Sequence, residues 1–148
     1  MNARPHPFIR PCTIDDIDWM VTLARTHYDG LFDEPQARLW VTARLKNSDM
    51  IFYRSENAFA VGHLAKRFNA PDRLQAFLTL LYAAPKSGLE AYFVLQALAS
   101  WAKDKGATKL WIGDSTGHDL GVFVKRLGGR LAGHTYVLDL DANPNPHG

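Results

Sequence analysis

The segment Arg73-Leu-Gln-Ala-Phe-Leu-Thr-Leu-Leu-Tyr-Ala-Ala-Pro85 is a nearly continuous apolar run that includes aromatic and β-branched residues. The run is too short to cross a membrane, and its composition is typical of a strand buried on both faces. Proline has no N–H to donate to a neighbouring strand, so Pro85 ends the run. The sequence therefore predicts a central, buried strand that stops at Pro85.

A helix and a second strand follow this run. Apolar residues recur every three and four positions, which predicts an amphipathic helix with a broad apolar stripe. The stripe consists of Phe93, Val94, Ala97, Leu98, Trp101 and Ala102. Gly106 is placed to end the helix in a left-handed conformation, and residues 109–112 form the next strand. Strand, loop, helix and strand make a right-handed crossover, which places both strands in one sheet.

The loop between the central strand and the helix has the sequence Lys86-Ser-Gly-Leu-Glu-Ala91. Backbone N–H groups at a helix N-terminus have no partners within the helix and carry partial positive charge. They suit a phosphate or pyrophosphate group, so residues 86–91 are the candidate ligand site. A simple turn at Gly88 is the alternative interpretation of the same loop.

Length and composition exclude several classes of protein. The 148 residues predict one domain, with tails at residues 1–7 and 141–148. A net charge of +2, scattered along the chain, predicts neither a nucleic-acid surface nor a membrane surface. The single cysteine excludes an internal disulfide, and the six histidines show no ligand spacing, so no metal is expected. No signal peptide or membrane span is predicted, and cytoplasmic residence is the expectation.

Two helices are predicted before the central strand, after a short strand at residues 8–10. Thr13 and Asp16 resemble a capping box at the start of the first helix, which Gly30 ends. Asp33 is placed to cap the second helix, because Pro35 in its first turn has no N–H to satisfy.

A hairpin precedes the central strand. Residues 50–54 and 58–65 are its two strands, and Glu56 and Asn57 form the turn between them. Residues 68–72 form a polar turn that leads into the central strand. After residue 112 come a loop, a short fourth helix that stops at Gly128, and a last strand at residues 130–140. The predicted order is β-α-α-β-β-β-α-β-α-β, an α/β (α+β) fold with a mixed sheet.

This order and its motifs resemble the GCN5-related N-acetyltransferase (GNAT) family, a three-layer fold, over the span from Phe8 to Leu140. The likeness rests on three segments. Residues 8–16 (FIRPCTIDD) resemble the family's first strand and helix start, residues 97–107 (ALASWAKDKGA) the end of its central helix, and residues 123–129 (FVKRLGG) its penultimate helix and following turn.

The resemblance implies that the protein binds acetyl-CoA as co-substrate. In the family the central strand splays from its neighbour, and its free backbone groups bind the pantetheine arm, here at Leu80, Leu81, Tyr82 and Ala83. The loop and helix start bind the pyrophosphate, here at Lys86, Ser87, Gly88, Leu89, Glu90 and Ala91. The chain departs from the family pattern at Leu89, where the family has Gly, and in the fourth helix, where Val124 or Lys125 occupies the place of a Tyr.

Acetyl transfer to an amine needs a group that takes a proton and a donor for the departing thiolate. Asp114 and His118, in the loop after residue 112, are the candidate base or amine-binding residues, although Asp114 can equally cap the fourth helix. Tyr82 is the candidate donor to the thioester or acid, with Tyr136 and His134 as alternatives. Each strand tyrosine can equally be a packed core residue whose hydroxyl is satisfied.

The segment from His27 to Glu34 joins the first two helices, which cover the acceptor site in the family. Its acidic residues Asp29 and Asp33 can attract a cationic amine, and Tyr28 and Tyr136 complete the candidate substrate site. Helix capping and solvated charge are the alternative for Asp29 and Asp33.

Two functions are consistent with the sequence. The first is N-acetyl transfer from acetyl-CoA to an amine of a small molecule or protein. The alternative is a catalytically weak or inactive GNAT-fold module that binds CoA or a protein partner. The family also leads us to expect a homodimer formed through the last strands.

Overall fold

A computed structural model describes residues 8–28, 30–113, 120–133 and 138–140. The chain divides into two compact units, Met1–Ile112 and Gly113–Gly148. The sheet and the first three α-helices belong to the first unit. None of the described helices is long and apolar enough to span a lipid bilayer.

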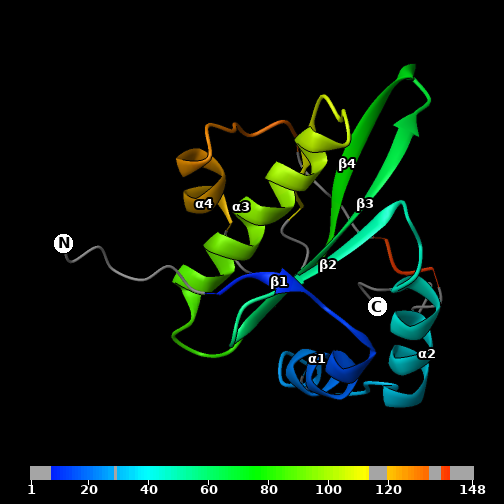
Figure 1. Ribbon diagram of the computed structural model, residues 1–148, viewed down its shortest axis with the longest axis vertical. Coiled ribbons are helices and arrows are strands. Elements are labelled where there is room, and N and C mark those ends of the chain that lie inside the picture. The colour runs from blue at the N-terminus through cyan, green and yellow to red at the C-terminus, as the bar shows by residue number, and fades with distance from the viewer. Residues whose placement is uncertain (1–7, 29, 114–119, 134–137, 141–148) are drawn as a thin grey trace, which may run out of the picture. The chain divides into compact units, whose positions relative to one another are not determined.

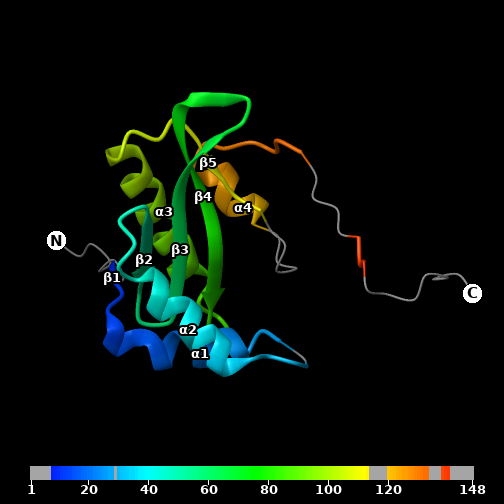
Figure 2. The same cartoon turned by 90° about the vertical axis from the view of Figure 1, so that its right-hand side faces the viewer.

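Five strands of the described chain form one mixed sheet in the order β1-β2-β3-β4-β5. The neighbouring strands from β1 to β4 are antiparallel (Figure 1), and β5, which is labelled in Figure 2, runs parallel to β4. The strands are β1 (Arg10–Pro11), β2 (Met50–Arg54), β3 (Ala58–Arg67), β4 (Ala70–Ala83) and β5 (Leu110–Trp111). The mixed sheet and the crossover between β4 and β5 confirm the predicted fold class.

Helices cover both faces of the sheet, so the fold has three layers (Figure 1). The face toward α1 (Ile17–Arg25) and α2 (Glu34–Arg44) carries the main apolar cluster, to which β2, β3 and β4 each contribute. Its buried members are Met20, Leu23, Ala24, Val41, Phe52, Phe59, Val61 and Tyr82. The opposite face packs against α3 (Gly88–Asp104), where Leu98 lies so close to Gly62 that a Cβ there would meet Leu98 Cδ1 at 2.4 Å.

Both predicted helix starts on the α1 side are confirmed. The short 3₁₀ helix η1 (Ile14–Asp16) leads into α1 and begins with the capping box, since Asp16 accepts from the Thr13 N–H at 2.8 Å. Asp33 Oδ1 accepts from the Gln36 N–H at 3.0 Å at the start of α2. The first helix ends at Arg25, five residues before the predicted stop at Gly30.

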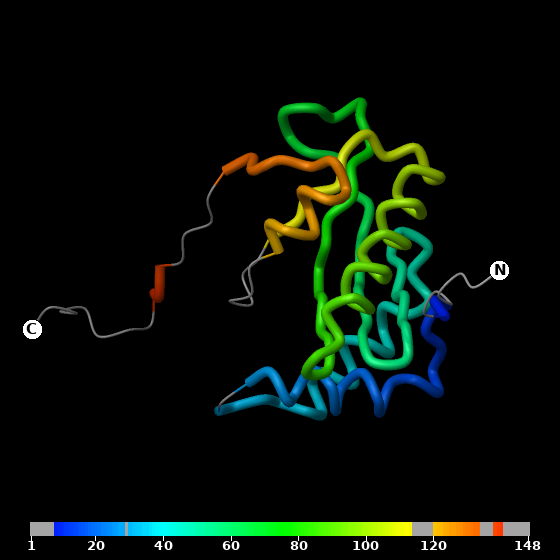
Figure 3. The backbone as a smooth tube through the Cα atoms, turned by 90° about the vertical axis from the view of Figure 1, so that its left-hand side faces the viewer, coloured from blue at the N-terminus to red at the C-terminus, as the bar shows by residue number. Residues whose placement is uncertain are grey.

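The hairpin of β3 and β4 is longer than the sequence predicted, and its tip projects beyond the rest of the sheet (Figures 2 and 3). The predicted turn at residues 68–72 was too wide, because β4 already begins at Ala70. Pro71 is tolerated within β4 because the register shifts between Lys66 and Arg67, and proline in a strand is accepted at such bulges. The strand β2 matches the prediction at both ends.

The end of α3 follows the prediction. Gly106 adopts φ 90°, the left-handed conformation that favours glycine, and the chain then enters β5. That strand is shorter than predicted, two residues rather than four. The first strand is also displaced, to Arg10–Pro11 from residues 8–10.

The second unit contains the predicted fourth helix, α4 (Gly121–Arg126), followed by Gly128 with φ 88°. The prediction of a last strand at residues 130–140 was wrong for its described part, because residues 130–133 and 138–140 are not in a strand. An alternating apolar pattern forms a strand only where a neighbouring strand accepts its hydrogen bonds and one face is buried. Here Leu131, Leu138 and Leu140 are at least 79% exposed.

Candidate active site

The strand β4 loses its parallel neighbour halfway along its length. Its only register pairs with β5 are Ala76 with Leu110 and Phe77 with Trp111, and β4 then continues to Ala83. The first half of β4 is hydrogen-bonded on the β5 side, since the Ala76 N–H donates to the Lys109 carbonyl at 2.8 Å. Beyond Phe77, no described strand pairs with this side of β4, which is the splay that the family resemblance implied.

The pairing with β3 decides which groups face the open side. Ala84 donates to the Asn57 carbonyl at 2.8 Å, so the backbone of Ala84 points toward β3. Backbone groups alternate in direction along a strand, so Leu81 and Ala83 point away from β3 toward the open edge. The predicted pantetheine-binding residues therefore divide into two that face the edge and two, Leu80 and Tyr82, that bond to β3.

The loop after β4 leads directly into an uncapped helix start. Lys86 has φ 66°, a left-handed conformation that is uncommon for a residue with a side chain. Ser87 is the N-cap of α3 but makes no side-chain cap hydrogen bond. Ala91 is the first residue of this turn whose N–H is bonded within the helix, to the Ser87 carbonyl at 3.0 Å. The N–H groups of residues 88–90 are therefore available to an anion.

The Glu90 carboxylate is held at Asn57, in the turn between β2 and β3. Its two oxygens accept from the Asn57 N–H at 2.8 Å and from Asn57 Nδ2 at 2.9 Å. Burial raises the pKa of Glu90, but hydrogen bonds from Asn57, Ser55 and Glu56 outweigh burial and leave this pKa below its ordinary value. The Glu90 side chain thus fixes the start of α3 to the sheet, and only its backbone N–H remains for a ligand.

An aromatic cluster lies beside the loop end of β4 and joins it to the segment after α1. The Tyr28 and Tyr82 hydroxyls are 2.5 Å apart, and the His27 and Tyr82 ring centroids are 5.1 Å apart. His27 Nε2 lies 2.9 Å from the Ala83 carbonyl oxygen, which can only accept, so Nε2 carries a hydrogen. Two sequence-predicted residues, Tyr28 and Tyr82, are thereby brought together, and His27 is an addition that sequence reasoning missed.

Tyr82 is 3% exposed and belongs to the main apolar cluster, whereas Tyr28 is 47% exposed. Burial and the hydrogen bond with Tyr28 raise the pKa of the Tyr82 phenol well above its ordinary value. Its hydroxyl therefore stays protonated at neutral pH, and can donate a hydrogen bond but cannot take up a proton.

The remaining predicted site residues have different outcomes. The Asp33 carboxylate caps α2, as one of its two interpretations required. Asp29, Asp114, His118 and Tyr136 lie outside the described residues, as does His134, so their roles stay predictions. No group of three or more potential metal ligands occurs among the described residues.

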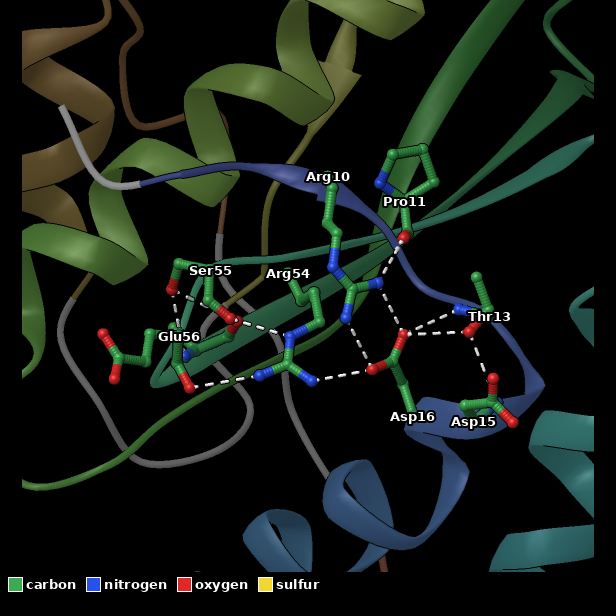
Figure 4. A network of polar contacts seen from close by, with 9 residues as sticks. Arg10, Pro11, Thr13, Asp15, Asp16, Arg54, Ser55 and Glu56 are labelled. Carbon is green, nitrogen blue, oxygen red and sulfur yellow. Dashed lines mark hydrogen bonds and ion pairs between the residues drawn. The ribbon is translucent and has the colours of Figure 1, made fainter.

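A buried polar network at the start of α1 is structural (Figure 4). The Asp16 carboxylate accepts from Nη1 and Nη2 of Arg10, at 2.8 and 2.9 Å, and from Arg54 Nη1 at 2.8 Å. Hydrogen bonds from Arg10, Thr13 and Arg54 hold the pKa of Asp16 far below its ordinary value. The sequence predicted only the Thr13 contact. A small pocket opens beside Arg10 and Arg54, but both guanidinium groups are already committed to Asp16 and to backbone carbonyls.

A second polar pair, His63 and Thr79, lies where β4 changes register. His63 Nδ1 is 2.8 Å from Thr79 Oγ1, and the His63 ring stacks on Phe77 with centroids 5.1 Å apart. The register shift falls between Val61 and Gly62 of β3 and leaves Thr79 of β4 without a Cα partner. The sequence offered no signal for this pair, because neither residue occurs in a recognisable motif.

Comparison with known proteins relates the geometry to solved structures. No family model matches the sequence, and no curated protein matches it. A predicted acetyltransferase from Clostridium acetobutylicum, with acetyl-CoA, is 17% identical at TM-score 0.73, over 91% of this chain and 97% of that one. Glucosamine-6-phosphate N-acetyltransferase from Arabidopsis thaliana is 15% identical at TM-score 0.72, over 93% and 100%.

An aminoglycoside 6'-N-acetyltransferase from Acinetobacter haemolyticus is 13% identical at TM-score 0.71, over 92% of this chain and 99% of that one. At these identities the likeness establishes the fold over nearly the whole length of each chain, and the fold expected from the sequence is confirmed.

Proposed function

Because this chain has the fold of the GCN5-related N-acetyltransferases, we propose that it transfers the acetyl group of acetyl-CoA to an amine. One observation carries the proposal. The open edge of β4 leads through a four-residue connection, residues 84–87, into a helix start at which the N-cap Ser87 makes no side-chain cap hydrogen bond. An edge that offers backbone hydrogen bonds and a helix N-terminus that favours negative charge suit the amide-containing arm and the pyrophosphate of CoA.

The described residues suggest how the molecule would lie. The N–H groups of residues 88–90 bind the pyrophosphate, and the Lys86 side chain adds positive charge beside them. The N–H groups of Leu81 and Ala83 and the Leu81 carbonyl form hydrogen bonds with the amides of the pantetheine arm, as one strand does with another, while the Ala83 carbonyl accepts from His27. The arm runs along the edge toward Phe77, where β5 closes it, so the thioester lies near that closed end.

The acceptor amine approaches from the α1 side of the sheet. Tyr28, with its half-exposed ring, contributes to this side. The hydrogen bond between the Tyr28 and Tyr82 hydroxyls links the segment after α1 to β4. Tyr82 lies near the loop end of the open edge, so we assign it to orienting Tyr28 and the arm. Direct attack by the amine is favoured over an acyl-cysteine route, because burial raises the pKa of Cys12, the one cysteine of the chain, to about 12.

The names of the fold neighbours and the acidic residues that follow Tyr28 in the sequence support an amine acceptor. Two neighbours are named for acetyl transfer to amino sugars or aminoglycosides, so a small amine is the first acceptor to test. Asp29 remains a proposed amine-binding residue from the sequence, and Asp114 and His118 remain its candidates for the base or for amine binding. A protein amino group is the second acceptor class.

Titration calorimetry with acetyl-CoA tests the proposal, followed by a thiol-release assay with glucosamine 6-phosphate, an aminoglycoside and polyamines as acceptors. We expect micromolar binding and acceptor-dependent release of free CoA. No heat of binding in a folded sample would overturn the proposal.

The alternative is a module that binds CoA without turnover. It is favoured by Val124 and Lys125 in α4, since neither side chain does the work of the family's tyrosine acid. The same assay separates the two functions, because this module would bind acetyl-CoA and release no thiol with any amine.

A further inference from the structure

A half-buried histidine lies on the same face of the sheet as the proposed acceptor site. In β3, His63 follows Phe59 and Val61 at a spacing of two, and both of these belong to the apolar cluster beneath α1 and α2. Gly62, between them, faces α3 instead. Side chains two apart in a strand share a face, so His63 lies on the α1 side, where the amine is expected.

The same histidine lies at the closed end of the open edge. Its ring stacks on Phe77, the last β4 residue that pairs with β5, and Nδ1 contacts the hydroxyl of Thr79 two residues later. Bulges are enriched next to active sites, where they redirect side chains, and here the irregularity brings Thr79 to His63. In the proposed binding mode the arm runs from residues 84–87 toward Phe77, so its thioester end lies at this position.

The environment of His63 suits a proton acceptor. Burial lowers the pKa of His63, and no charged group of the strands or helices beside it contributes to the shift. Its register neighbours, Met50 of β2 and Phe77 of β4, do not titrate. The ring is thus neutral near pH 7, with one N–H and one lone pair. No hydrogen bond joins Nε2 to any residue in the described part of the chain.

We propose that His63, in place of the sequence candidates Asp114 and His118, is the general base of the acetyl transfer, and that Thr79 positions it by accepting the Nδ1 hydrogen. The Nε2 lone pair then takes a proton from the amine as its nitrogen bonds to the acetyl carbon. The carbon–sulfur bond breaks, the sulfur leaves as a thiolate, and His63 returns the proton to the thiolate through solvent. This inference rests on the proposed function and names a residue that the sequence did not single out.

The first test is the pH profile of kcat/KM for wild-type protein, His63→Asn and His63→Gln with one active acceptor. Removal of a general base costs a factor of about 100 or more in kcat. We expect that loss in both variants, with Kd for acetyl-CoA within twofold of wild type by calorimetry. The wild-type profile should fall on the acid side with an apparent pKa below that of a free histidine, about 6.5, and the variants should lack this limb.

Thr79 provides a matched pair of variants. Thr79→Val removes the hydroxyl and keeps the shape, so turnover should fall about tenfold with little change in Kd, and Thr79→Ser should restore turnover.

The tautomer of His63 gives a readout that does not depend on activity. Nitrogen NMR of the histidine rings should show the Nδ1–H form of His63 in wild type, and the Nε2–H form would overturn the proposal.

The outcomes separate this inference from the proposed function. Wild-type turnover retained within threefold in folded His63→Asn, or an unchanged acid limb, overturns the role of His63 alone. Wild-type protein that binds acetyl-CoA but transfers nothing also overturns it, while the CoA site stands. Wild-type protein that neither binds nor turns over acetyl-CoA overturns both.

Discussion

The start of η1 and the start of α3 differ in how their backbone N–H groups are satisfied. At η1, Thr13 and Asp16 form a reciprocal capping box, and two arginines neutralise the Asp16 carboxylate. At α3, Ser87 gives no cap, and the Glu90 carboxylate is directed away to Asn57. The start of η1 is capped by its own side chains, and its ion pairs connect it to β1 and β2. The start of α3 has no side-chain cap and lies beside a strand edge that no described strand pairs, and this is where we propose that CoA binds.

The largest expected effect is on the free energy of unfolding and concerns the capped start of η1. Asp16→Asn removes the charge that two arginines share, and breaking a buried ion pair costs about 3 kcal/mol of unfolding free energy. Denaturant unfolding measures the loss, and the affinity of the folded variant for acetyl-CoA should be unchanged. Asp18→Asn is the matched control, because Asp18 pairs with Arg38 at the surface with its side chain 82% exposed, and its unfolding curve should match wild type.

The pH dependence sharpens this prediction. The folded-state pKa of Asp16 lies below its unfolded value of about 3.9, so its contribution is complete above that value and is lost as the pH falls below it. The difference between wild type and Asp16→Asn should be constant from pH 8 to pH 5 and shrink below pH 4. A difference that grows as the pH falls would contradict the assignment.

The next effect is obtained by giving α3 the cap that it lacks. Ser87→Asp places a carboxylate at the helix N-terminus, which should stabilise the fold by about 0.5 kcal/mol. The same charge competes with the pyrophosphate, so acetyl-CoA should bind at least about tenfold more weakly, equivalent to about 1.4 kcal/mol. Ser87→Asn is the neutral control and should lose less affinity. If both properties were unchanged, the uncapped start would not be the anion site.

The smallest effect concerns the start of α2, which is capped by a side chain, as the start of η1 is. Asp33→Ala removes the N-cap of α2 and should cost about 1 kcal/mol of unfolding free energy. KM for the amine separates the two interpretations of this residue. An unchanged KM identifies Asp33 as a cap, whereas a raised KM with unchanged stability would identify it as an acceptor contact.

Local sequence signals predicted the features that depend on neighbours in the chain. Thr13, Asp33 and Gly106 act through hydrogen bonds or backbone angles within a few residues, and each was predicted correctly. The crossover that creates the loop after β4 was likewise visible as a change of apolar period from continuous to helical.

The site itself depends on residues that are distant in sequence. Tyr28 and Tyr82 are 54 residues apart, Asn57 and Glu90 are 33 apart, and His63 and Thr79 meet only because of a register shift between two strands. Register and bulges are set by how whole strands pair, so no single sequence motif predicts these contacts. The prediction of a last strand was wrong in its described part for a related reason, since no described strand pairs with this alternating pattern.

Amide NMR of the protein during titration with CoA tests most directly whether the start of α3 and the edge of β4 form the CoA site. We predict that the largest shifts fall on the backbone N–H groups of Gly88, Leu89 and Glu90 and on those of Leu81 and Ala83, while Asp15 and Gln36 at the capped starts do not move. Saturable binding with the largest shifts elsewhere, or no shifts at millimolar CoA, would contradict this assignment of the CoA site.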